Sequence, residues 1–422
     1  MKNLIYFALL AIAGLTASCS ESYEETSWIN LNQPVFMSET EFRNSVKVRT
    51  SGEQITNLGK ICFYNGYLFI SETEKGIHVI NNTNPSQPKN VAFIELLGNA
   101  DISVRNNILY ADSYIDLVWF DISSPEKPVL KGRLENVFPD AAPSCDNTYG
   151  IDYTACYDAN GKLPGVIVGW EVKKIKSTNN DAFYEYLMDD GSYAMNASGG
   201  DKSGGSGVNG SMSRFAIYKD YLYAVFNYQM HIFDLKAEKP AEIPDFFYVG
   251  NVETIFSYKE NMFLGTPTGM VIYSVANPEQ PDYCSQITHV YGCDPVVVDN
   301  DVAFVTVRSG NFCGQTVDEL IIIDVADVQH PKPLCSYSMT NPKGLGIDNG
   351  TLFLCDDGLK VFDARNPMTL MANQLLHKKG MDGYDLIPFG NTLMMIADDG
   401  LYQYDYSNLQ NIKQISYIPI KE

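Results

Sequence analysis

Short apolar runs recur along the chain after residue 60, and each follows a polar turn. Runs of about four such residues bounded by turn residues are strand signals, and no helical period competes with them. The seven runs are Tyr67–Ile70, Ile108–Ala111, Tyr221–Ala224, Met262–Gly265, Val302–Val305, Thr351–Leu354 and Thr392–Met395. The pattern predicts an all-β chain in which one unit is repeated seven times.

The spacing of these runs predicts the architecture. Four of the six intervals are 40 or 41 residues, one is 49 and one is 113. Each repeat is interpreted as four strands, which cannot bury both faces of a sheet alone and must stack against copies of themselves. Radial stacking closes a ring, so we expect a seven-bladed β-propeller over residues 54–422. The longest interval places an insertion between blades 2 and 3, at about residues 140–211.

The third strand of the repeat ends in Asp, and a turn containing Pro follows it. The best example is Val118–Leu130, with the sequence VWFDISSPEKPVL. The chain resembles the LVIVD-repeat family of β-propellers in this pattern over most of residues 54–422. The resemblance implies the propeller fold but little about activity, because most members carry no assigned reaction.

One Asp recurs at the end of this strand and is interpreted as scaffold. An Asp side chain at the start of a turn accepts a hydrogen bond from the backbone two residues on. The recurring residues are Asp121, Asp234, Asp324, Asp363 and Asp405. Spread around a ring, they are too far apart to form a metal or acid/base site.

Aligning the first strand of each repeat separates two kinds of position. One column is apolar in every repeat and should pack between blades: Ile61, Ile102, Phe215, Ile255, Val296, Leu345 and Leu386. The residues just before it should face the central channel, since side chains alternate along a strand. Four of them are charged, namely Lys60, Asp101, Arg214 and Asp385. They are predicted to lie at the channel mouth, either as a polar ligand site or as a solvated rim of mutual ion pairs.

The insertion and a second excursion at residues 308–319 are both predicted on one face of the ring. We call it the elaborated face. This face carries two kinds of connection: from the fourth strand of one blade to the first strand of the next, and from the second to the third strand within a blade. Function concentrates on loops that a rigid scaffold positions. Trp170, Tyr184, Tyr186 and Tyr193 in the insertion are candidates for stacking on sugar rings, or for ordinary packing.

The first residues predict export. Lys2, an apolar stretch over residues 4–15 and small residues before Cys19 have the features of a secretory signal, and the apolar stretch is too short to span a bilayer. Residues 15–19 resemble a bacterial lipobox, which implies a lipoprotein signal peptide at 1–18 and acylation of Cys19. Residues 19–53 are a tether and an N-terminal segment, expected to pack near the last blade; the spacing of Ser38 and Glu41 predicts a short capped helix there. We expect a lipid-anchored protein of the bacterial outer membrane, exposed at the cell surface.

The net charge limits the binding partners of the chain, and its cysteines are candidates for disulfides or buried thiols. The chain has 30 Lys and Arg against 51 Asp and Glu, a formal charge of −21, which disfavours nucleic acid and anionic lipid and leaves the lipid anchor as the membrane contact. Disulfides are predicted between Cys293 and Cys313 and between Cys145 and Cys156. Four further cysteines fall on predicted strands and should be buried thiols: Cys62, Cys284, Cys335 and Cys355.

Two functions stay open. No nucleophile elbow, phosphate loop, zinc motif or dinucleotide fingerprint is found, so no metal and no cofactor are expected. The favoured hypothesis is a monomeric, non-catalytic module that binds or scaffolds an extracellular glycan, peptide or surface protein. The alternative is a surface hydrolase or lyase, with Asp101 and Asp385 as acid and base and Lys60 and Arg214 stabilising negative charge.

Overall fold

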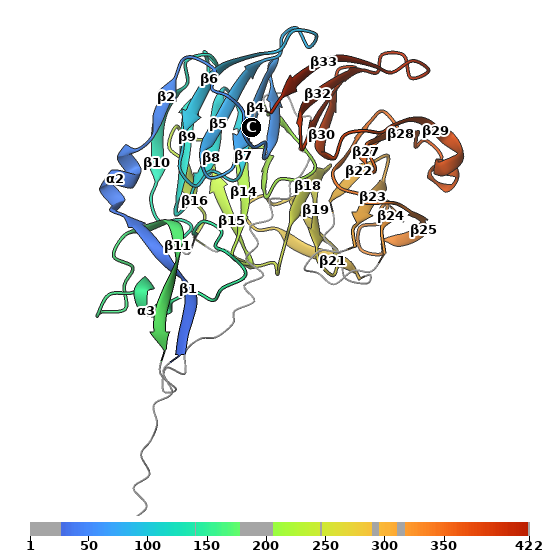
Figure 1. Ribbon diagram of the computed structural model, residues 1–422. Helices are drawn as coiled ribbons and strands as arrows, with labels where there is room; N and C mark the ends of the chain where they lie inside the picture. The colour runs from blue at the N-terminus through green and yellow to red at the C-terminus, as the bar shows by residue number, and fades with distance from the viewer. Residues whose placement is uncertain are drawn as a thin grey trace, which may run out of the picture.

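Seven blades are arranged in one ring in the computed structural model, which describes residues 27–139, 141–177, 206–244, 247–288, 295–309 and 317–420 (Figure 1). Each blade is an antiparallel sheet of strands consecutive in sequence. Blade 1 contains β3 (Ile61–Tyr64), β4 (Tyr67–Glu72), β5 (Gly76–Asn81) and β6 (Lys89–Glu95), blade 2 contains β7 (Ile102–Arg105), β8 (Ile108–Ser113), β9 (Asp116–Asp121) and β10 (Val129–Leu134), and blade 3 contains β13 (Phe215–Tyr218), β14 (Tyr221–Phe226), β15 (Gln229–Asp234), β16 (Ala241–Glu242) and β17 (Phe247–Tyr248). Blade 4 contains β18 (Thr254–Tyr258), β19 (Asn261–Thr266), β20 (Gly269–Ser274) and β21 (Asp282–Thr288), and blade 5 contains β22 (Val296–Asp299), β23 (Val302–Val307), β24 (Glu319–Asp324) and β25 (Lys332–Ser338). Blade 6 contains β26 (Leu345–Asp348), β27 (Thr351–Cys355), β28 (Leu359–Asp363) and β29 (Gln374–Lys378), and blade 7 contains β30 (Gly383–Phe389), β31 (Thr392–Ala397), β32 (Gly400–Asp405) and β33 (Lys413–Pro419). The predicted seven-bladed propeller is confirmed.

The ring closes where blade 1 meets blade 7, and among the described residues no strand of one blade pairs with a strand of the other. The inner strand β3 contacts β7 on one side and β30 on the other. Across this closure Asn82 and Gln403 exchange two amide hydrogen bonds, of 2.9 and 2.7 Å, and both side chains are buried. Side chains therefore hold the first and last blades together.

The seven apolar residues of the inner strands pack between blades as predicted. Each of them is at most 3% exposed, from Ile61 in blade 1 to Leu386 in blade 7. Complete burial of one such side chain stabilises the fold by about 1.5–3 kcal/mol. A repeated interface of this kind makes the ring a rigid support for its loops.

The recurring Asp residues cap turns, so the scaffold interpretation is confirmed. Their Oδ1 atoms accept hydrogen bonds from the backbone N–H two residues later, at 2.7–3.2 Å. Donation by Ser123 and Ser407 lowers the pKa of Asp121 and Asp405 below the ordinary value. These carboxylates contribute to turn geometry at the face opposite the elaborated one.

The N-terminal segment lies against blades 1 and 2, so the expected position near the last blade is wrong. Strand β2 (Lys47–Arg49) extends blade 1 by pairing with its outer strand β6. Helix α2 (Glu39–Asn44) has the predicted capping box between Ser38 and Glu41, and its Phe42 packs on Tyr114 of blade 2. The segment thus covers the outer edge of blade 1, and β33 remains the outermost strand of blade 7.

The insertion begins after β10 and ends before β13, between blades 2 and 3 as predicted. Strand β11 (Val166–Ser177) pairs with β1 (Ser27–Met37) in a long ribbon that projects below the ring in Figure 1. A short helix α3 (Tyr153–Cys156) packs beside it, and a two-residue strand β12 (Val208–Asn209) follows later. A 3₁₀ helix η1 (Pro367–Asn373) lies in blade 6. Within the described ranges, none of the helices has the length and apolar character required to cross a membrane.

The predicted disulfide between Cys145 and Cys156 is wrong. Cys156 ends helix α3, where its buried thiol donates to the Asp152 carbonyl oxygen at 3.4 Å, and no disulfide joins it to Cys145. The pair Cys293 and Cys313 lies outside the described residues, as does Cys19. The strand cysteines are thiols as predicted; Cys62, Cys284 and Cys355 are buried, and Cys335, on an outer strand, is half-buried.

Candidate ligand-binding site

The end of the insertion fills the middle of the ring. Strand β12 pairs with the inner strand β3, as an additional strand on the channel side of blade 1. The backbone N–H groups of Gly207 and Gly210 donate to the carbonyl oxygens of Val104 and Ile61 at 2.7 and 3.0 Å. We call residues 207–214 the channel plug. It occupies the space that the sequence assigns to an open channel.

Asp385 holds the middle of the plug. Its Oδ1 accepts hydrogen bonds from the backbone N–H and the hydroxyl of Ser211, at 2.8 and 3.0 Å. The same hydroxyl oxygen accepts the N–H of Leu345 at 2.9 Å. The plug therefore connects blade 1 with blades 6 and 7.

Lys60 and Asp101 hold the residues that follow, up to the end of the plug. The Oδ2 of Asp101 accepts the backbone N–H of Arg214 at 2.7 Å, and its Oδ1 accepts the hydroxyl of Ser213. The Lys60 ammonium donates to the Met212 carbonyl oxygen. Lys60, Asp101 and Asp385 are each at most 1% exposed. These three residues bind the backbone of the chain itself.

Burial dominates the ionisation of this group. It lowers the pKa of Lys60 to about 7 and raises the pKa of Asp385 to about 7, and it also raises the pKa of Asp101. The attraction between Lys60 and the two carboxyls opposes each of these shifts. The structure thus brings the four predicted residues together around the plug, but Lys60, Asp101 and Asp385 are buried and hydrogen-bonded to it, so they do not form a solvated rim. Arg214 alone of the four is partly exposed.

Glycine is required where the plug passes Asp385. A Cβ atom built on Gly210 would lie 2.0 Å from the Asp385 Oδ2, and one built on Gly207 would lie 2.6 Å from the Cys62 sulfur. Real Cβ atoms essentially never come this close to other atoms. The glycines at the end of the insertion therefore serve close packing and not flexibility alone.

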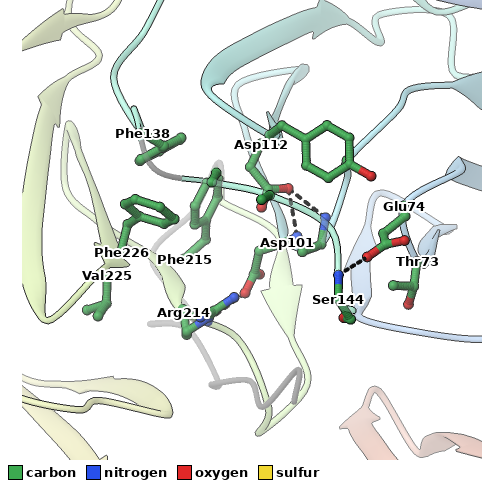
Figure 2. A pocket seen from close by; sticks show the side chains of 15 residues that line it. Thr73, Glu74, Asp101, Asp112, Phe138, Ser144, Arg214, Phe215, Val225 and Phe226 are labelled. Atoms are coloured by element: carbon green, nitrogen blue, oxygen red, sulfur yellow. Dashed lines mark hydrogen bonds between the residues drawn. The ribbon is translucent and has the colours of Figure 1, made fainter. Parts of the chain in front are cut away.

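Arg214 leads from the plug into a pocket on the elaborated face. Figure 2 shows its lining, which comes from blades 1, 2 and 3 and from the insertion. Polar groups are supplied by Thr73, Glu74, Asp101, Asp112, Ser144 and Arg214, and apolar groups by Tyr114, Phe138, Phe215, Val225 and Phe226. A few convergent polar groups in a largely apolar concavity are typical of a ligand site.

Asp112 is the fixed carboxylate of this pocket. Its Oδ1 accepts hydrogen bonds from the backbone N–H groups of Ala100 and Asp101, at 2.7 and 2.9 Å, and from the Asn99 amide at 3.0 Å. Burial nevertheless raises the pKa of Asp112 to about 7. Nearby, Glu74 accepts the Ser144 backbone N–H at 3.1 Å, which ties the insertion to blade 1 (Figure 2). Both carboxyls are positioned by backbone.

Aromatic rings form the opposite wall. Phe138 of the insertion lies with its ring centroid 5.4 Å from Phe226 and 6.4 Å from Phe215. These rings link the insertion to the two inner strands of blade 3. The pocket is thus built jointly by the ring and the insertion.

Sequence reasoning missed Glu74, Asp112, Phe138 and Phe226. Asp112 carries a readable signal, since it is a charged residue inside the apolar run of β8. Of the predicted aromatic residues, Trp170 donates from Nε1 to the Pro143 carbonyl oxygen at 2.7 Å and lines a second pocket, which the insertion forms together with Glu39 and Ile115. Tyr184, Tyr186 and Tyr193 lie outside the described residues. In the ranges that the structure describes, no three His, Cys, Asp or Glu side chains are grouped to hold a metal ion.

Comparison with known proteins supports the fold and does not assign a reaction. No family model and no curated protein sequence matches the chain. The periplasmic gluconolactonase PpgL of Pseudomonas aeruginosa is similar in structure, with a TM-score of 0.52 and 10% identity over 94% of this chain and 98% of that one. BamB of Moraxella catarrhalis gives a TM-score of 0.45 and 8% identity over 88% and 91%. The propeller fold is consistent with a binding or scaffolding module.

Proposed function

We propose that this chain is a non-catalytic, lipid-anchored module of the cell surface that binds an extracellular glycan or peptide in the pocket over blades 1–3. The observation that carries the proposal is the convergence of Glu74, Asp112 and Arg214 with an aromatic wall, on the face where the insertion lies. The lipobox-like residues before Cys19 support the lipid anchor, and the resemblance to the LVIVD-repeat family, most of whose members carry no assigned reaction, agrees with a non-catalytic role.

The use of the channel residues argues against catalysis at the channel mouth. A general acid or base must come within hydrogen-bond reach of the proton that it transfers. Asp101 and Asp385 instead accept hydrogen bonds from Ser213, Arg214 and Ser211 beneath the plug. The hydrolase or lyase hypothesis therefore loses the two carboxylates on which it depended.

One observation favours a second candidate function. Asp112 lines the pocket, and a carboxyl with a pKa of about 7 suits proton transfer at neutral pH. A hydrolase or lyase centred on Asp112 would turn over the ligand that it binds. Turnover of each bound compound must therefore be measured together with binding.

The test is a glycan and peptide binding screen with the soluble protein from Ser20 onward, followed by calorimetry and product analysis of each hit. Asp112→Asn keeps the oxygen that accepts the three N–H groups, so the variant should fold. Because it replaces the carboxyl group of the pocket by an amide, it should bind the ligand at least tenfold more weakly. Glu238→Gln, on an exposed side chain of the opposite face, is the matched control and should bind like the parent protein. Equal affinity of the Asp112→Asn variant would reject the pocket, and product formation lost in that variant would favour the enzyme.

Anchoring has its own test. Cys19→Ser should abolish acylation and release the full-length protein from membranes in a fractionation experiment. Retention of that variant in the membrane fraction would reject the lipobox interpretation, without bearing on the pocket.

A further inference from the structure

Two tyrosines of blade 3 are exposed side by side on the elaborated face. Tyr228 is 42% exposed and Tyr248 is 73% exposed. Their ring centroids are 6.3 Å apart and their planes differ by 27°, so the rings are nearly parallel. We call this pair the tyrosine platform. Large apolar side chains that face water in a stacked pair are unusual on a surface that otherwise carries many charges.

The backbone of Tyr228 is strained for a tyrosine. Asn227 and Tyr228 form the two-residue turn between β14 and β15, with φ of 48° and 65°. Hairpin turns with positive φ at both positions favour Asn followed by Gly, since a Cβ atom is unfavourable there. Glycine would relax this turn, and the tyrosine instead presents a ring at its tip.

The platform continues directly from the pocket. Phe226 pairs with Gln229 across β14 and β15, and Gln229 pairs with Tyr248 across β15 and β17. Directly paired residues of adjacent strands point to the same face of a sheet, so Tyr248 shares the face of Phe226. Phe226 lines the pocket, and the turn with Tyr228 begins one residue after it.

We propose that the tyrosine platform stacks against a sugar ring, and that the ligand of the adjacent pocket is a neutral glycan chain. The inference rests on the proposed function and names its ligand class. The C–H face of a sugar ring fits the negative face of an aromatic ring. The next sugar unit would enter the pocket, where the Glu74 and Asp112 carboxyls can accept hydrogen bonds from its hydroxyls. The net charge of −21 disfavours acidic polysaccharides.

The experiment measures retardation of the soluble protein in native gels that contain mannan, xylan, dextran or heparin. We expect retardation by at least one neutral polysaccharide and none by heparin. Tyr228→Gly and Tyr248→Ala should each weaken the interaction at least tenfold, and Tyr248→Phe should retain it. Because glycine relaxes the turn, Tyr228→Gly should melt at the same temperature as the parent or higher, which separates lost binding from lost folding.

Tyr283→Ala, at a residue 58% exposed on strand β21, is the matched control and should bind like the parent. Lack of retardation by all three neutral polysaccharides, or parent-like binding of both platform variants, would overturn the inference. Peptide binding that is lost in Asp112→Asn but kept in the platform variants would preserve the pocket and reject the glycan. Glycan binding lost in the platform variants but kept in Asp112→Asn would preserve the platform and reject the pocket.

Discussion

Blades 4–7 and blades 1–3 are built on the same repeat, yet they differ in what has been added to it. Blades 4–7 are plain four-stranded sheets. Blade 1 carries β2 on its outer edge and β12 on its inner edge, blade 2 is followed by the insertion, and the outer strand of blade 3 is split into β16 and β17. The candidate site therefore lies where the repeat is interrupted, and the regular blades 4–7 support it.

The inner strands show the same contrast at a single position. The residue before the buried apolar column is Lys60, Asp101 or Arg214 in blades 1–3, and Thr254, Pro295 or Gly344 in blades 4–6. Blade 7, the neighbour of blade 1, has Asp385 there, and Asp385 binds the plug. Charge at this position marks the path of the plug.

The largest loss of stability is expected from a substitution where the added N-terminal segment packs on the ring. Phe42 is fully buried, with the Tyr114 ring centroid 6.1 Å away and the Arg133 guanidinium 5.5 Å from its ring. Phe42→Ala should cost about 3–5 kcal/mol of local stability. It should make the N-terminal segment around helix α2 sensitive to protease while the ring stays intact. Phe353→Ala in blade 6 should cost as much but expose the whole ring at once, as measured by limited proteolysis and denaturant unfolding. Identical cleavage patterns would contradict the division into added part and support.

A smaller effect is expected at the plug. Gly210→Ala places a Cβ atom against Asp385 and should lower the free energy of unfolding by about 1–3 kcal/mol. Gly169→Ala on β11 is the control, because its Cβ atom would come no nearer than 3.8 Å to Val35. Equal stability of the two variants in urea would show that the plug does not pack against Asp385.

Asp112 predicts a dependence of stability on pH. Its pKa is about 7 in the folded protein against an ordinary 3.8, so the folded state holds a proton that the unfolded chain has released. The contribution of Asp112 to the free energy of unfolding is therefore complete below about pH 4 and is lost as the pH rises through about 7. Asp112→Asn should lose less stability than the parent between pH 4 and 8, by at least about 1 kcal/mol, as measured by melting at each pH. Parallel curves would show that Asp112 titrates normally.

The smallest effect is expected on the plain half. Asp301 and Lys259 form an exposed ion pair at 2.5 Å between blades 4 and 5, and such pairs contribute less than about 1 kcal/mol. Asp301→Asn keeps a residue that tolerates the positive φ of 61° at this turn. Its free energy of unfolding should stay within about 0.5 kcal/mol of the parent; a loss comparable to that of Gly210→Ala would remove the distinction between the halves.

Sequence reasoning succeeded where the repeat is local. Strand starts such as Tyr67 and Ile108, the turn role of Asp121 and the burial of Ile61 follow from alternation and turn chemistry within one blade. The plug could not be foreseen, because Gly210 and Asp385 are 175 residues apart and only the closed ring brings them together. The N-terminal segment was misplaced for the same reason, since pairing of β2 with β6 depends on which sheet edge is open.

Because blades 1 and 7 do not exchange a strand among the described residues, their contact forms a seam in the ring. The plug binds both of these blades. Besides the inner-strand contact and the Asn82–Gln403 amide pair, Ser211 fastens blade 7 to a segment that is already paired with blade 1. The plug thus acts as a cross-brace that the chain supplies between its second and third blades, before the last five blades have been synthesised. In hydrogen exchange, the amides of Gly210 and Ser211 should open together with the seam and report the first step by which the ring comes apart.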